Sequence, residues 1–229
     1  MRRQFVQKMP MARQRVGVPP PFTPKSIDGL VLWLDANAGI TKDVNGQVSQ
    51  WDDQSGEDNH AAQSTPASQP IHEANIVNGR PVVRFDGADD FMEFSAITNI
   101  RTAFFVVRSF TPVPSRGIIL GDSSAFHWHD DGDNMFHSSN SHSNIRTGSA
   151  YTNGSVVSPT SLLKPTVFEV ITVATAGNVT ASRLTRDRGF SDRVWWGDYA
   201  DVLIYDTPLS SADREAVEEY LADKYGISI

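Results

Sequence analysis

One stretch of the sequence, residues 199–226, constrains the fold most, because it joins a strongly apolar strand to a well-marked helix. The segment ADVLIYD carries apolar side chains on both faces of an extended chain. One face would hold Ala200, Val202 and Ile204, and the other Tyr199, Leu203 and Tyr205. A strand with two apolar faces must be covered on both sides, so we expect this strand at the centre of a sheet.

The helix that follows has clear predicted ends. Pro208 prevents the strand from continuing, and Ser210 or Ser211 can cap the free amides of the first helical turn. Gly226 is available as a left-handed stop. The apolar stripe is narrow and consists of Val217, Tyr220 and Leu221. A narrow stripe favours a helix on the outside of a β domain.

The rest of the chain predicts strands and turns. About a dozen short apolar or alternating segments lie between Gly-, Asp- and Asn-rich turns, and residues 29–35 form the first of them. Three hairpins are expected, pairing 80–86 with 91–94, 125–128 with 134–137, and 166–174 with 179–185. Many short strands and one late helix predict an all-β, two-sheet antiparallel jelly-roll sandwich with one surface helix.

Composition narrows the classes of protein. A length of 229 residues with 39% apolar residues suits one sandwich domain, and no segment has the ~20 apolar residues that a membrane span needs. The absence of cysteine excludes disulfides, zinc–thiolate sites and thiol catalysis. The first residues contain no apolar run of signal-peptide length, so we expect synthesis in a reducing cytoplasm without secretion by that route.

Charge is divided unevenly along the chain. Residues 1–25 carry six basic residues and no acid, whereas the other 14 basic residues stand against all 27 acidic ones, a balance of −13. We therefore expect an extended, Pro-rich basic arm over 1–26 and a domain over 27–229. The arm can be a disordered tail or a segment that orders on a protein partner. The residues expected to bind a partner are Arg2, Arg3, Phe5, Val6, Lys8, Met9, Arg13, Arg15 and Phe22. Specific nucleic-acid binding is not expected, because the basic residues lack interleaved aromatic residues.

Two groups of residues are candidates for metal binding. His127 and His129 share one face of an extended chain with Asp131 close by, a set that could hold a divalent metal. A solvated hairpin is the favoured interpretation of the same residues, so no metal site is predicted there. Calcium is the candidate for a set of aspartates near strand ends, Asp52, Asp53, Asp86, Asp89 and Asp90. Turn formation is the alternative for these aspartates, and no cofactor other than calcium is considered.

Catalysis is not expected, whereas sugar binding stays open. The sequence contains no Gly-x-Ser-x-Gly elbow and no phosphate-binding glycine loop, so the protein is not predicted to be an enzyme. Five aromatic residues could offer flat faces to a glycan, or could pack inside the sandwich. They are Trp51, Trp128, Tyr151, Trp195 and Trp196.

Four segments carry a resemblance to a known family: residues 29–41, 48–70, 78–94 and 199–226. Together they resemble the laminin-G or concanavalin-A-like jelly-roll modules of bacteriophage structural proteins, whose glucanase relatives have a Glu-x-Asp-x-x-Glu pattern that is absent here. The resemblance implies a virion structural protein, a capsid decoration or cement protein that contacts the major capsid protein through its arm and forms a symmetric array. The alternative that it implies is a tail or collar module that binds a glycan of the host surface.

Overall fold

A computed structural model describes residues 21–113, 116–125, 127–190 and 193–229. The arm residues from Arg2 to Arg15 therefore lie outside the described residues. The described chain is mostly β, with twelve antiparallel strands, as the sequence predicts. The strands are β1 (Leu30–Asp35), β2 (Ile40–Lys42), β3 (Val48–Trp51), β4 (Ala61–Ala62), β5 (Ile71–Val77), β6 (Arg80–Asp86), β7 (Met92–Ser109), β8 (Leu120–Gly121), β9 (Ser149–Thr152), β10 (Ser155–Val157), β11 (Glu169–Leu184) and β12 (Trp196–Tyr205).

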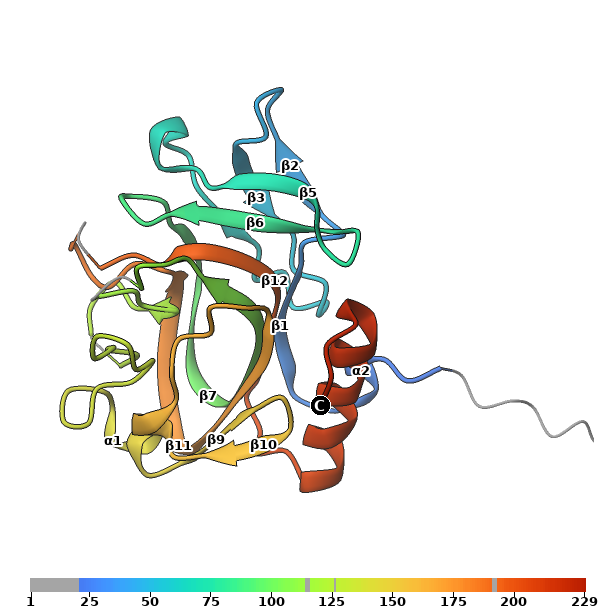
Figure 1. Cartoon of the computed structure of the whole chain (residues 1–229), viewed down its shortest axis with the longest axis vertical. Coiled ribbons are helices and arrows are strands. Elements are labelled where there is room, and N and C mark those ends of the chain that lie inside the picture. Colours follow the sequence, from blue (N-terminus) through green and yellow to red (C-terminus); the bar gives the residue numbers. More distant parts are fainter. Residues whose placement is uncertain (1–20, 114–115, 126, 191–192) are drawn as a thin grey trace, which may run out of the picture.

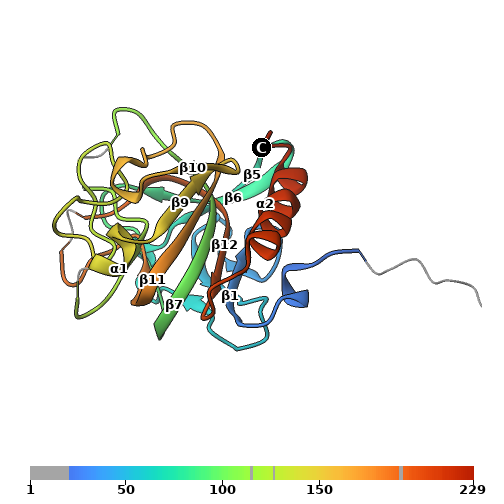
Figure 2. The same cartoon turned by 90° about the horizontal axis from the view of Figure 1, so that it is seen from below.

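Two α-helices and three short 3₁₀ turns complete the described fold. The helices are α1 (Ser143–Arg146), a single turn, and α2 (Ser211–Tyr225). The 3₁₀ turns are Pro24–Ser26, Pro66–Ser68 and Pro159–Ser161. Figure 1 shows α1 and α2 at opposite sides of the β structure, and the turned view in Figure 2 keeps them apart.

Strand β12 occupies the centre of the sheet, which confirms the prediction for this segment. It pairs with β7 along one edge, and its other edge pairs first with β6 and then with β1. A bulge between Tyr199 and Asp201 changes the predicted alternation. Tyr199 therefore joins Val202 and Ile204 on the inner face, while Ala200 lies on the opposite face.

Two long strands connect the layers of the sandwich. Strands β7 and β11 pair with each other over most of their length, with several register shifts. Because β7 also pairs with β4 and β12, and β11 with β8 and β9, all twelve strands belong to one hydrogen-bonded network. The predicted hairpin of 166–174 with 179–185 is wrong, because residues 169–184 form the single strand β11. The predicted hairpin of 80–86 with 91–94 is also wrong, since β6 pairs with β5 and β12 while β7 pairs with β11. Residues 125–128 and 134–137 contain no regular strand among their described positions.

Two apolar clusters stabilise this arrangement. The larger lies inside the folded sheet and includes Trp51, Phe105 and Ile204. The smaller lies between the outer face of the sheet and α2, and includes Leu203 and Leu221. Burial of a large aliphatic or aromatic side chain contributes about 1.5–3 kcal/mol, so these clusters supply the main stabilisation of the described body.

Helix α2 begins and ends where the sequence predicts. The Ser210 side chain accepts the backbone N–H of Asp213 at 3.1 Å, and Gly226 has the left-handed φ of 63° that ends the helix. Figure 2 shows α2 against the outside of the sheet near β1 and β12. The helix therefore lies on the outside of the β domain, as predicted, and it covers the outer face of the central strand.

Candidate functional site

The first described residues of the chain lie against α2 and the end of β12, and contacts with both elements hold them in place. Pro24 is buried, and the hydroxyl of Tyr205 donates a hydrogen bond of 3.0 Å to the Pro24 carbonyl. The Phe22 ring packs edge-on against Tyr220 of α2, with 6.0 Å between ring centroids, and remains 39% exposed. Residues 22–26 thus form a root packed on the body. Phe22, one of the predicted partner-binding residues, contacts its own domain.

A groove of 660 Å³ runs between this root and α2. It is lined by Phe22, Arg80, Ala216, Glu219, Tyr220, Asp223 and Lys224. Glu215, Glu219 and Asp223 are exposed and four residues apart, so they form one acidic row on the helix. Glu215 pairs with Arg214, whereas Glu219 and Asp223 make no ion pair with any described residue. The exposed row of α2 beside the root is therefore acidic, while Arg80 and Lys224 also line the groove.

A buried charge network holds α2 to the sheet beneath this groove. The Lys224 ammonium lies 2.8 Å from an Asp35 oxygen and 2.6 Å from an Asp201 oxygen. Trp33 Nε1 and the Tyr225 hydroxyl each donate to Asp201 at 2.8 Å. Burial raises the pKa of Asp201 to about 6, although Lys224 opposes the shift. The network joins β1, β12 and α2. It was not predicted from the sequence, although Asp201, an acidic residue inside the apolar segment 199–205, could have indicated it.

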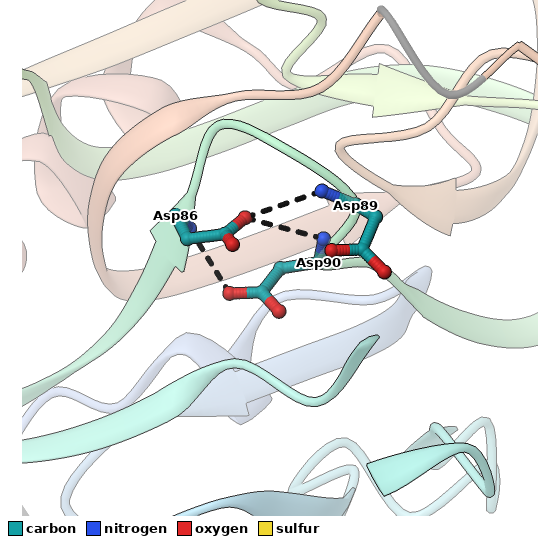
Figure 3. Close-up of side chains that lie close together, drawn as sticks. All are labelled: Asp86, Asp89 and Asp90. Atoms are coloured by element: carbon teal, nitrogen blue, oxygen red, sulfur yellow. Dashed lines mark hydrogen bonds between the residues drawn. The ribbon is translucent and has the colours of Figure 1, made fainter. Parts of the chain in front are cut away.

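The turn after β6 gathers three of the five predicted calcium ligands. Ligand oxygens of Asp86, Asp89 and Asp90 lie within 4.8 Å of one another, the one such group among the described residues. Figure 3 shows Asp86 accepting backbone N–H groups of Asp89 and Asp90, while Asp90 accepts the N–H of Asp86. Burial, reinforced by the charge of Asp86 and then that of Asp89, raises the pKa of Asp90 to about 7.

This turn supplies only part of a calcium site. One oxygen of each aspartate already accepts a backbone N–H or, for Asp89, the hydroxyl of Ser68 at 2.9 Å. Three carboxylate oxygens remain, against the six to eight that calcium takes. The other two candidates are used elsewhere, because Asp53 accepts the backbone N–H of Trp33 at 2.8 Å and Asp52 accepts from Gln50 at 2.6 Å.

The candidate histidine metal site is not assembled. His127 Nδ1 accepts the backbone N–H of Thr180 at 2.9 Å, whereas His129 Nδ1 lies 2.7 Å from the Asp130 carbonyl and must donate to it. Asp131 is exposed in the turn and forms a backbone bridge with Asn134. No metal-ligand group within the described residues contains any of these three candidates. These three candidates therefore do not come together as a ligand set in the described part of the chain.

Three of the five aromatic residues predicted to contact a glycan are buried. Trp51, Trp128 and Trp195 are at most 1% exposed, so their ring faces are closed to a sugar and the prediction for them is wrong. Tyr151 is partly buried, with the Arg214 guanidinium 3.9 Å from its ring centroid. Trp196 is also partly buried and packs edge-on with Phe110 at 5.6 Å. The sandwich core accounts for the first three rings.

Comparisons with known proteins give no further identification: no family of related sequences, no characterised protein and no solved structure matches this chain. Within the described residues, no helix is long and apolar enough to cross a membrane.

Proposed function

We propose that this chain is a bacteriophage virion structural protein, a capsid decoration or cement protein that its N-terminal residues attach to the major capsid protein. The observation that carries the proposal is the division of charge, with five basic residues among residues 1–20 and an acidic body behind them. A segment of this kind binds an acidic protein surface, while the body repels one. The resemblance of residues 29–41, 48–70, 78–94 and 199–226 to phage modules supports the same assignment.

The root connects the N-terminal residues firmly to the folded body, as attachment through these residues requires. Pro24 is held by the Tyr205 hydroxyl, so a pull on the preceding residues would reach the central strand β12 directly. Twenty residues extend to about 65 Å at most, which is enough to reach a neighbouring capsid subunit. A protein that binds only the assembled shell stabilises that assembly by mass action.

Co-sedimentation with purified phage particles tests the proposal. The full chain and a body of residues 21–229 would be compared, because the described fold begins at residue 21 and the shorter chain keeps the root. We expect the full chain to pellet with particles and the body to stay in the supernatant. Binding should weaken steeply with salt, because exposed charges are screened over about 8 Å at physiological ionic strength.

A charge variant separates the basic residues from the rest of the segment. Replacing Arg2, Arg3, Lys8, Arg13 and Arg15 with Gln keeps the length and the apolar residues Phe5, Val6 and Met9. This variant should lose attachment, whereas the matched control Lys25→Gln with Lys42→Gln, two exposed lysines of the described body, should keep it. Equal attachment of the body 21–229 would refute the proposal.

A further inference from the structure

A second pocket lies at the end of the molecule remote from the root. It has a volume of 360 Å³ and is lined by Ser124, Ala125, His127, Asn140, His142 and Arg188. His142 caps α1, and Figures 1 and 2 both place α1 across the body from α2. Small-molecule sites in proteins occupy about 300–1,000 Å³, so this pocket has the size for one small ligand.

The two histidines of this pocket are fixed in one tautomer. His127 Nδ1 accepts the backbone N–H of Thr180 at 2.9 Å, and His142 Nδ1 accepts the backbone N–H of Asn144 at 3.1 Å. A backbone amide can only donate, so each Nδ1 carries a lone pair and each neutral ring carries its hydrogen on Nε2. An Nε2–H has no lone pair for a metal, so these rings act as hydrogen-bond donors.

The positions of the two rings are set by the backbone. The ring centroids are 4.6 Å apart, and the His142 backbone N–H donates to the His127 carbonyl at 2.8 Å. Thr180 belongs to β11, and its carbonyl also accepts from Trp128 Nε1 at 3.0 Å. Neither Nε2 is among the buried side-chain atoms of the described residues that lack a partner. Both side chains are partly exposed, so the fold holds these donors in place at the surface of the protein.

The other residues that line the pocket provide hydrogen-bond acceptors and add little net charge to it. The Ser124 hydroxyl donates to an Asp122 oxygen at 2.6 Å, which leaves its own oxygen free to accept. Arg188 pairs with both carboxylate oxygens of Asp187 at 3.1 Å. Burial, followed by the charges of His127 and Arg146, lowers the pKa of His142, so this ring is neutral near pH 7.

We infer that this pocket binds a neutral saccharide. Hydroxyl groups both donate and accept, which matches two imidazole N–H donors beside the Ser124 oxygen and the Asn140 amide. The Ala125 methyl group and the imidazole faces suit the C–H face of a sugar ring. A charged ligand gains less, because the His142 ring is neutral near pH 7 and Arg188 is paired with Asp187. The site goes beyond the proposed attachment function and lies away from the tryptophans that the sequence suggested.

The test uses the full chain and nuclear magnetic resonance. Long-range ¹H–¹⁵N spectra of the imidazoles report the tautomer of each of the six histidines. Glucose, galactose and N-acetylglucosamine would then be added up to about 100 mM, which covers millimolar dissociation constants. We expect Nε2–H tautomers at His127 and His142, and at least one sugar that shifts these two rings but not the ring of His60.

A matched pair of variants locates the binding. His142→Ser keeps a helix-capping oxygen but removes the ring, and should weaken sugar binding about tenfold, as expected for the loss of one hydrogen bond to the ligand. His60→Ser is the control, because His60 Nδ1 also accepts a backbone N–H, from Asp53 at 3.0 Å, outside the pocket. This control should leave the affinity unchanged.

Four results would overturn the inference. They are an Nδ1–H tautomer at either pocket histidine, no ring shift with any of the three sugars, equal sugar affinity in His142→Ser, or shifts with sodium acetate or phosphate alone. The last would mark an anion site. None of these results depends on attachment to particles, so this inference and the proposed function fail separately.

Discussion

The Tyr205 hydroxyl and the Pro24 carbonyl, 3.0 Å apart, join the end of the central strand β12 to the root of the N-terminal segment. Both residues are buried, so the hydrogen bond is shielded from water. The link spans 181 positions of the sequence and fixes where the basic segment leaves the body.

Replacing Tyr205 with Phe should weaken the root while leaving the fold intact. The ring keeps its edge-on contact with Phe104, at 5.9 Å between centroids, and only the hydroxyl is lost. We expect a loss of about 1 kcal/mol in the free energy of unfolding, measured by urea denaturation. Tyr151→Phe is the control and should change nothing, since no described residue bonds the Tyr151 hydroxyl. A neutral result for Tyr205→Phe would mean that the Pro24 link adds no stability.

Lys224 should be among the most sensitive positions of the body. Lys224→Met leaves the carboxylates of Asp35 and Asp201 without their shared cation, which should cost about 3–5 kcal/mol at pH 7. The cost should be smaller near pH 4, where protonation of Asp201 removes one of the two charges. Urea denaturation at the two pH values would measure it, with the exposed Lys42→Met as control. A loss that is the same at both pH values would contradict this reading of the network.

Asp90 should make stability fall as pH rises. Its pKa is about 7 in the folded state against an ordinary value of 3.8, so the folded chain holds a proton between these values that the unfolded chain has lost. Stability is therefore fully present below about pH 4 and declines up to about pH 7. Asp90→Asn should remove most of this decline and be more stable than the natural chain at pH 8, by roughly 2–4 kcal/mol. Asp131→Asn in an exposed turn should behave as the natural chain does, and a decline unchanged in Asp90→Asn would exclude this origin.

Calcium should have little effect on the same turn at mildly acidic pH. Three free carboxylate oxygens are about half of a calcium coordination shell, and protonation of Asp90 removes a charge from them. We expect calcium at about 5 mM, which exceeds the dissociation constants of weak calcium sites, to stabilise the protein by less than about 1 kcal/mol at pH 6. The stabilisation should be larger at pH 8. Differential scanning calorimetry with and without a chelator would measure this. A large effect at pH 6 would show a fuller ligand set than the turn provides.

Sequence patterns correctly predicted those parts of the fold that depend on neighbouring residues in the chain. The limits of α2 follow from Ser210 and Gly226, whose capping depends on their own neighbours. The hairpin across Gly177 and Asn178 failed, because pairing with β7 carries β11 through this turn-like sequence. Pairing over long sequence distances overrides a local turn signal.

The candidate sites were less accessible from the sequence. Trp51 and Trp128 have polar neighbours in the chain, yet the sandwich buries both. The imidazole tautomers depend on backbone amides, and the one from Thr180 is 53 positions from His127. The pocket of His127 and His142 also needs Arg188 from a distant loop, so no motif could reveal it.

The most direct test of the central claim asks whether the basic segment is sufficient for attachment. Residues 1–20 would be fused to an unrelated monomeric reporter protein and mixed with purified phage particles that lack this chain. We expect the fusion to sediment with the particles and to be displaced by the full chain. A fusion that remains in the supernatant, while the full chain sediments, would contradict the account and place attachment in the folded body.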